Sequence, residues 1–314
     1  KDPMVYLVSH TWADRFEKGR RRATIEAYSN CDSVLLYNDM SNEKVTYLGR
    51  KKNNGIGTHF MWENRDIRYN VLRAVGYYKG KAVAEDILVL NGLEQSPHFG
   101  ILYQDTKPLL KGEDGYNYLY RINCGGDDFT DSFGQLWMQD NTNYSRSWAA
   151  SFNELNPYLA SQRTTNDPIR GSRDWKLFQH FRFGRHQLEY NFPVADGMYR
   201  IEFYFTEPWH GTGGSASTDC EGLRIFDVAV NDSVVLDDLD IWAESGHDGA
   251  CKKVVYAIIK GGLLKIHFPE VKAGQALISG IAIASANSDL KPTLFPASDW
   301  NWEKASKEVM EKTP

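Results

Sequence analysis

The sequence predicts an all-β protein made of two β-sandwiches. Nearly every readable segment alternates apolar and polar residues with a period of two, and short turns rich in Gly, Asn and Asp separate these segments. No strand is followed by a long helical pattern, which argues against a parallel α/β sheet. A chain of 314 residues is long enough for two such domains, each with its own core.

A small antiparallel sandwich is predicted over residues 1–93. Its clearest element is a hairpin, in which strands at Asn70–Tyr78 and Ala82–Leu90 are joined by the turn Lys79-Gly80-Lys81. The next stretch, residues 94–115, mixes Pro and Gly with polar residues and has no sustained period, so it is predicted to be a connector. Two shorter strands of the sandwich are expected at Ala23–Tyr28 and Ser33–Tyr37.

A larger sandwich is predicted over residues 116–287. The segment Met198–Glu207 alternates so regularly that we expect a half-buried strand, with aromatic residues on one face and Arg200 and Glu202 on the other.

A second hairpin is predicted near the end of this sandwich. Strands at Val254–Ile259 and Leu263–Phe268 flank Gly261-Gly262, and paired glycines supply the positive φ angles of a two-residue hairpin loop. Residues 288–314 form a polar tail, in which a short helix is expected at Trp300–Lys312.

Composition and charge exclude several classes of protein. The 42% of apolar residues, together with 9 Trp, 17 Tyr and 15 Phe, excludes a disordered or fibrous chain. The net charge of −5 makes nucleic acid an unfavourable partner, because neutralising phosphates needs a basic face. Apolar stretches such as Leu277–Ala284 are far shorter than the roughly 20 residues that cross a bilayer, so no membrane span is predicted.

The four cysteines show no C-x-x-C spacing, so a zinc site is not predicted. A bond between Cys220 and Cys251 stays open, depending on whether the compartment is oxidising. A structural calcium ion has no motif behind it, and we predict no cofactor and no metal.

Two predicted loops, residues 137–152 and 207–221, combine aromatic with polar side chains. Sugars present apolar C–H faces and many hydroxyls, so a sugar site combines aromatic platforms with carboxylate, amide or His partners. The loops have this composition, although a tryptophan in a sandwich is also commonly part of the core.

Motifs for catalysis are missing from the sequence. It contains neither G-x-S-x-G nor H-E-x-x-H. A glycosidase needs two carboxylates on either side of the scissile bond. Glu207, Asp219 and Glu221 lie in one loop region, but no partner acid is identifiable, and we interpret them as solvated loop residues or calcium-type oxygen donors.

The larger sandwich resembles malectin. The resemblance covers residues 116–287 and implies a β-sandwich lectin of the galactose-binding-like or jelly-roll type that binds glucose-containing oligosaccharides. In bacteria such domains are carbohydrate-binding modules attached to glycoside hydrolases. The segments that carry the resemblance, in order, are Tyr120 to Gly126, Leu177 to Phe183, Tyr190 to Pro193, Tyr199 to Glu207, Phe226 to Val228, and Asp238 to Ile241 followed by Gly246-His247.

The resemblance implies a set of carbohydrate-binding residues. The aromatic ligands of malectin fall on Phe183, which has lost the hydroxyl group of a tyrosine, and on Trp209 and His210. An earlier loop tyrosine maps loosely onto Trp148 or Phe152. The binding aspartate of malectin falls near Ala273, where no acid stands, so the specificity of malectin for diglucose is not carried over. The full set expected at the site is Phe183, Trp209, His210, Trp148, Tyr144, Asp219 and Glu221.

The first sandwich resembles the immunoglobulin-like domain, of unassigned function, that follows the catalytic barrel in many bacterial family 2 glycoside hydrolases of the β-galactosidase type. The resemblance implies that the chain is an accessory region of a longer polypeptide with an upstream barrel. It also implies a periplasmic, cell-surface or secreted location, reached through a signal peptide outside this segment. The segments that carry it are Val8 to Trp12, Ala27 to Val34, Leu48 to Lys51 and Leu72 to Tyr77.

Three functions remain open from the sequence: a non-catalytic carbohydrate-binding region, spacer domains that only pack on the barrel, and a catalytic sandwich. A spacer predicts that Phe183, Trp209 and Trp148 are buried. A catalytic sandwich predicts two close carboxylates in a cleft, with a raised pKa.

Overall fold

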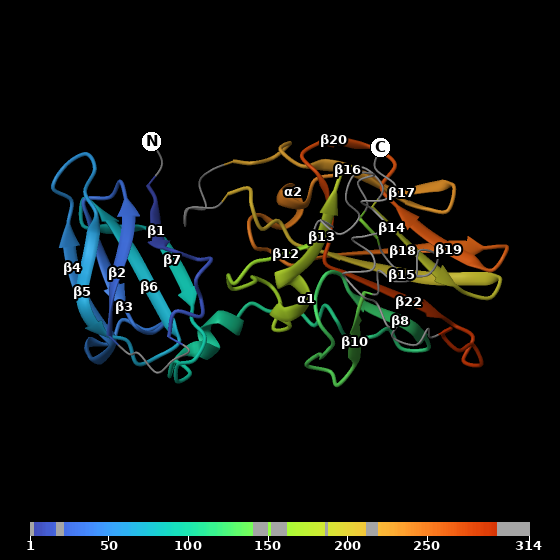
Figure 1. The fold of residues 1–314 in the computed structure, drawn as a ribbon, viewed down its shortest axis with the longest axis horizontal. Helices are drawn as coiled ribbons and strands as arrows, with labels where there is room; N and C mark the ends of the chain where they lie inside the picture. The colour runs from blue at the N-terminus through green and yellow to red at the C-terminus, as the bar shows by residue number, and fades with distance from the viewer. Residues whose placement is uncertain are drawn as a thin grey trace, which may run out of the picture.

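The computed structural model describes residues 3–16, 22–140, 150–151, 162–185, 188–211 and 219–293. The protein is all-β, as predicted, and two bodies of β-sheet lie side by side along its long axis (Figure 1). The expected helix at Trp300–Lys312 lies outside the described residues.

The first body is a sandwich of two antiparallel sheets with strand orders β1–β2–β5 and β4–β3–β6–β7. The predicted hairpin is confirmed: β6 pairs with β7, and Lys79 and Gly80 in its turn have φ angles of 49° and 78°. Trp62 lies between the sheets with none of its surface exposed. The elements are β1 (Val5–Val8), β2 (Arg22–Ser29), β3 (Ser33–Tyr37), η1 (Lys44–Thr46), β4 (Tyr47–Lys52), β5 (Phe60–Asp66), β6 (Val71–Tyr78) and β7 (Lys81–Val89).

The second body contains two large sheets and a small one. Their orders are β18–β15–β22–β8–β10–β9, then β11–β14–β19–β16–β17 with β20 beside β16, and β12–β13–β21. The elements of the first large sheet are β8 (Asn117–Asn123), β9 (Phe129–Thr130), β10 (Leu136–Gln139), β15 (Gly197–Phe205), β18 (Cys251–Ile259) and β22 (Gly280–Ser285). Those of the second are β11 (Ala150–Ser151), β14 (Leu188–Pro193), β16 (Ile225–Val230), β17 (Ser233–Leu239), β19 (Leu263–His267) and β20 (Val271–Ala273). The small sheet is formed by β12 (Gln162–Thr164), β13 (His180–Gly184) and β21 (Ala276–Ile278).

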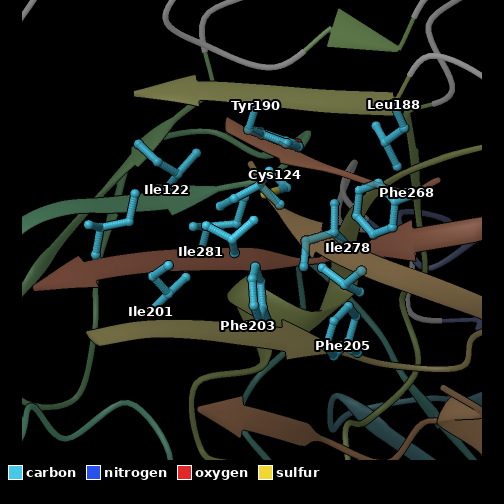
Figure 2. Packing of buried hydrophobic residues seen from close by; sticks show 14 of the residues in the cluster. Ile122, Cys124, Leu188, Tyr190, Ile201, Phe203, Phe205, Phe268, Ile278 and Ile281 are labelled. Carbon is cyan, nitrogen blue, oxygen red and sulfur yellow. The ribbon is translucent and has the colours of Figure 1, made fainter. Parts of the chain in front are cut away.

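The core of the second body fills the space between its two large sheets. Figure 2 shows Ile201 and Phe203 of β15 near Ile281 of β22, with Tyr190 of β14 opposite them. All four side chains are fully buried. Burial of large apolar and aromatic side chains is the main favourable term in folding, so this layer fixes the positions of the loops at the ends of the strands.

Strand β15 is buried on both faces, whereas alternation predicted a half-buried strand. Arg200 and Glu202 lie on the face away from the core, yet only 8% and 1% of their surface is exposed. They bind each other, and Glu202 also accepts a hydrogen bond from Tyr204. Their low exposure arises because residues of the connector, such as Leu109, cover this face. The sequence pattern showed which side chains are polar but not that another segment of the chain covers them.

The predicted second hairpin is wrong. Strands β18 and β19 are consecutive, but β18 pairs with β15 in one large sheet while β19 pairs with β14 and β16 in the other. The turn between them carries the chain from sheet to sheet. Gly261 and Gly262 do have positive φ angles, 82° and 77°, so the glycines are needed for the turn although the turn is not a hairpin.

The connector is packed between the two bodies. The connector contains the short 3-10 helix η2 (Phe99–Tyr103), and the second body contributes α1 (Trp175–Gln179). The ring centroids of Phe99 and Tyr103 lie 5.7 and 5.1 Å from the ring centroid of Trp175. These rings join an apolar cluster that also includes Val71 of the first body and Tyr204 of the second.

Short helices α1 and α2 (Ile241–Ser245) were missed by the sequence analysis because one turn is too short to show a period.

The four cysteines are free thiols and all are buried. The bond between Cys220 and Cys251 that the sequence left open is not formed.

The start of the connector is tied to the first body by Asp39. This carboxylate is fully buried and accepts hydrogen bonds from the hydroxyl groups of Ser96 and Ser41 and from the ring and backbone of His98. Burial opposes ionisation of Asp39, but these hydrogen bonds outweigh it and hold its pKa well below its usual range.

Replacing Asp39 should therefore remove a pH-dependent part of the stability. A lowered pKa means that the contribution is complete above the unfolded pKa of 3.8 and is lost as the pH falls below it. We expect Asp39→Asn to cost about 3 kcal/mol at pH 7 and to flatten the fall in stability between pH 5 and 2. Urea unfolding at several pH values measures this, with the exposed Asp66→Asn as control. An unchanged acid limb in Asp39→Asn would contradict the assignment.

Candidate functional site

Two of the predicted aromatic residues meet at one end of the second body. Phe183 lies in β13, and Trp209 follows the end of β15; their rings pack edge to face, with centroids 4.9 Å apart and an interplanar angle of 86°. Phe181 contacts the same indole from the core side at 5.4 Å. Phe183 and Trp209 are both half-buried, so they are neither free platforms nor core residues.

A buried ion pair holds the loop that carries Trp209. The Glu207 carboxylate is fully buried, binds the guanidinium of Arg224, and accepts the backbone N–H groups of Trp209 and His210 at 3.0 and 3.1 Å. Arg224 is 1% exposed and also lies over the Trp209 ring, 5.0 Å from its centroid. Glu207 therefore fixes the direction of Trp209 and His210, and it is neither a solvated loop carboxylate nor an available general acid.

The two predicted carboxylates, Asp219 and Glu221, lie at the surface. Asp219 accepts the backbone N–H of Glu221 at 3.0 Å. Tyr144 and Trp148 lie outside the described residues.

A cleft of about 790 Å³ lies between the two bodies, and the sequence analysis did not predict it. Trp209 lines it together with Asp167 and His247 of the second body and His10 and Asp86 of the first. Elements β12, β13, α1 and α2 lie on the side of the second body that faces the first (Figure 1). Only a prediction of how the two bodies pack could have revealed the cleft, because its residues come from distant parts of the sequence.

The first body reaches the second through His10. Its Nδ1 hydrogen-bonds Asp167 and its Nε2 lies 2.9 Å from Asp86. Burial disfavours the charged ring, but the hydrogen bonds and negative charges of both carboxylates outweigh it and raise the pKa of His10 from 6.5 to about 10. His10 is therefore an imidazolium at neutral pH that bridges one carboxylate from each body.

A second His–Asp pair lines the cleft. His247 Nε2 lies 2.9 Å from Asp248 Oδ2, while His247 Nδ1 donates to the backbone carbonyl of Glu207 at 3.1 Å. Asp248 is 7% exposed, and burial raises its pKa from 3.8 to about 6, against the opposing effect of His247. The Asp248 backbone N–H also donates to the Glu207 carbonyl, at 2.9 Å.

Comparison with known families places the second body. The family model of the malectin domain matches residues 118–288, more than half of the chain. The chain belongs to the malectin family. The malectin domain is a carbohydrate-binding, non-catalytic domain, and the resemblance stated for residues 116–287 is thereby confirmed.

The curated relatives are animal malectins. The malectin of Danio rerio is 27% identical over 150 residues, which is 48% of this chain and 47% of the relative. Malectin-B of Xenopus laevis is 25% identical over 149 residues, 47% of this chain and 48% of the relative. The chain thus spans about half the length of the curated relatives it matches.

Solved structures are similar over most of the chain at low identity. A β-glucuronidase of Bacteroides uniformis aligns with 93% of this chain and 30% of its own, at 22% identity and a TM-score of 0.44. The extracellular domain of ANXUR2 from Arabidopsis thaliana aligns with 95% of this chain and 85% of its own, at 13% identity and a TM-score of 0.44.

Across the described residues, no helix combines the length and apolar character that crossing a membrane requires.

The buried ion pair between Glu207 and Arg224 should contribute strongly to stability. Glu207→Gln keeps the shape of the side chain but leaves the Arg224 guanidinium buried without a counter-charge, which typically costs about 3–5 kcal/mol. We expect a lower midpoint in urea unfolding and a change in near-ultraviolet circular dichroism from Trp209. The exposed Glu221→Gln is the matched control. A Glu207→Gln variant as stable as the parent would rule out this anchoring role.

Proposed function

We propose that the protein is a non-catalytic accessory region of a larger bacterial family 2 glycoside hydrolase of the β-galactosidase type, in which the malectin-like domain binds oligo- or polysaccharide. Membership of the malectin family supports the carbohydrate-binding part. The immunoglobulin-like segments of the first sandwich support the enzyme context, an upstream barrel in the same polypeptide, and a periplasmic, cell-surface or secreted location.

The domain boundaries belong to this proposal. We assign residues 1–93 to the immunoglobulin-like sandwich, 94–115 to the connector, 116–287 to the malectin-like sandwich and 288–314 to a tail. In the described part of the chain, strands β1–β7 pair among themselves and strands β8–β22 pair among themselves, which supports the division.

The observation that carries the binding proposal is the placement of Trp209. Its indole packs against Phe183 and at the same time lines a cleft that also presents Asn166, Thr165 and Arg170. An aromatic surface beside amide, hydroxyl and guanidinium groups suits a pyranose, whose C–H face stacks on the ring while its hydroxyls are hydrogen-bonded. A spacer domain would bury both rings completely. We place the glycan against Trp209, Phe183 and His210, with Tyr144, Trp148, Asp219 and Glu221 as further contacts.

Binding should depend on the aromatic pair. Each ring contributes about 1 kcal/mol beyond area burial, and ordering a flexible glycan offsets much of this, so we expect a Kd roughly between micromolar and millimolar. A glycan array followed by isothermal titration calorimetry identifies and measures the ligand. Trp209→Ala should abolish measurable binding, and Phe183→Leu should weaken it about fivefold while keeping most of the packing volume.

The matched control is Tyr78→Ala, which removes an exposed aromatic residue from the hairpin of the first sandwich. It should bind as the parent does. Glycan binding that survives in a folded Trp209→Ala variant would contradict the placement of the site.

A catalytic role has one observation in its favour, since Asp167 and Asp248 lie close together in a cleft and the pKa of Asp248 is raised. However, Asp167 is bound by His10 and Asp248 by His247. One oxygen of each lies within 4.8 Å of the other, which is closer than the roughly 5–5.5 Å between the carboxyl groups of retaining glycosidases. The two carboxylates are therefore bound to histidines and too close together to stand on either side of a glycosidic bond.

We expect no hydrolysis of nitrophenyl glycosides by this chain. Release of nitrophenol is followed by absorbance against an enzyme-free blank over several hours. Turnover that is present in the parent and lost in Asp248→Asn would refute the non-catalytic assignment.

A further inference from the structure

The cleft holds a group of side chains that the carbohydrate proposal does not use. Asp167, His247 and Asp248 each offer one ligand atom, and these atoms all lie within 4.8 Å of one another. They come from two loops that run side by side, because the backbone N–H of Arg170 donates to the carbonyl of Asp248 at 2.8 Å. The cleft of about 790 Å³ gives an ion from solvent a path to all three residues.

His247 is oriented as a metal ligand. Its Nδ1 donates to the Glu207 carbonyl at 3.1 Å, which leaves Nε2 directed at Asp248. Metal-binding histidines almost always donate their other ring nitrogen to a carbonyl or carboxylate in this way, which fixes the tautomer and the ring. Nε2 is therefore the ring nitrogen left for a metal ion, and Asp248 Oδ2 lies 2.9 Å from it, close enough for both atoms to bind one ion after a small movement.

Asp248 has an unused oxygen. Its Oδ1 is buried and has no hydrogen-bond partner among the described residues, and the residue is 7% exposed. A buried carboxylate oxygen without a donor is costly, and most such atoms in folded proteins are satisfied by a partner, an ordered water or an ion. Asp167 can also bind a further group. Its Oδ1 hydrogen-bonds His10, while its Oδ2 has, among the described residues, a single long hydrogen bond of 3.3 Å from the Thr165 hydroxyl.

We propose that Asp167, His247 and Asp248 bind one divalent cation of the Zn²⁺ or Mn²⁺ type at the boundary between the two bodies. One imidazole nitrogen with two carboxylate oxygens suits these ions, whereas Ca²⁺ prefers oxygen ligands alone. Ligand atoms on one such ion lie roughly 3–4 Å apart, so the three side chains need to close by less than about 1 Å each. Solvent or a ligand in the cleft completes the coordination.

A second acidic cluster in the protein does not share these features. Asp227, Asp237 and Asp238 also lie within 4.8 Å of one another, but the cluster has no imidazole. Asp238 is paired with Lys272, and Asp227 accepts the backbone N–H of Asp238 at 2.9 Å. One lysine faces three carboxylates, so the cluster keeps a negative charge and provides a control for simple attraction of cations to acidic groups.

The experiment is a titration of the tag-free chain, previously dialysed against a chelator, with ZnCl₂, MnCl₂ and CaCl₂ by isothermal titration calorimetry without any glycan. We expect one saturable Zn²⁺ or Mn²⁺ site per chain and weaker binding of Ca²⁺. His247→Gln and Asp248→Asn should each lower the affinity at least tenfold. Asp237→Asn, which removes the same charge from the second cluster, should leave the affinity within twofold of the parent.

Spectroscopy separates this site from other surface binding. Co²⁺ added to the parent should give the visible absorption spectrum of a low-symmetry site with nitrogen and oxygen ligands. Asp248→Asn should lack this spectrum. Its circular dichroism and its melting temperature in chelator should match those of the parent.

The proposal is overturned by the absence of saturable binding, by binding that folded Asp248→Asn and His247→Gln retain in full, or by binding that is lost in Asp237→Asn. Because no glycan is present, the result is independent of the carbohydrate-binding proposal.

Discussion

Glu207 holds both the loop that carries Trp209 and the pair formed by His247 and Asp248. Its side chain is committed to Arg224 and to the N–H groups of Trp209 and His210. Its backbone carbonyl accepts from His247 and from the N–H of Asp248. A buried carboxylate is retained only where its charge and its lone pairs are all satisfied, so the aromatic loop and the His–Asp pair are fixed relative to each other by one residue at the end of β15.

The interface between the two bodies rests on polar contacts of a similar kind. His10 extends from the first body and binds Asp86 of that body and Asp167 of the second. The positive charge of its imidazolium offsets one of the two negative charges of these carboxylates, whose burial would otherwise cost free energy. The apolar side of the same interface is supplied by Phe99 of the connector, which packs against Trp175 of the second body. The position of Asp167, and with it one wall of the cleft, is therefore set by contacts made on both sides of the boundary.

The sequence predicted the parts of the structure that depend on local alternation and turn chemistry. The hairpin of β6 and β7 and the glycines at 261 and 262 follow from residues close in sequence. The partner of a strand is a different matter, because β18 and β19 are neighbours in sequence yet belong to opposite sheets. Which strands pair is decided by burial of the whole core, and the period of two is the same for either choice.

The candidate site was predictable to a similar extent. Phe183 and Trp209 could be named from the malectin resemblance, and their rings do meet. Glu207 was counted among loop carboxylates because a sequence does not show that Arg224, seventeen positions later, lies against it. His10 and Asp167 were not predicted as site residues, since they are separated by more than 150 residues and lie in different bodies.

The physical consequence is that the cleft and the aromatic pair form one continuous region around Trp209. One part of the indole packs on Phe183 and Phe181, another lies under Arg224, and the ring also borders the cleft. A ligand that contacts this ring therefore comes close to Asp167 and Asp248, which line the same cleft. Each carboxylate is paired with an imidazole, Asp167 with His10 and Asp248 with His247, so its negative charge is largely offset. What the cleft presents beside Trp209 is therefore a set of paired polar groups rather than a net negative charge, and hydrogen-bonding geometry, more than charge, constrains a ligand there.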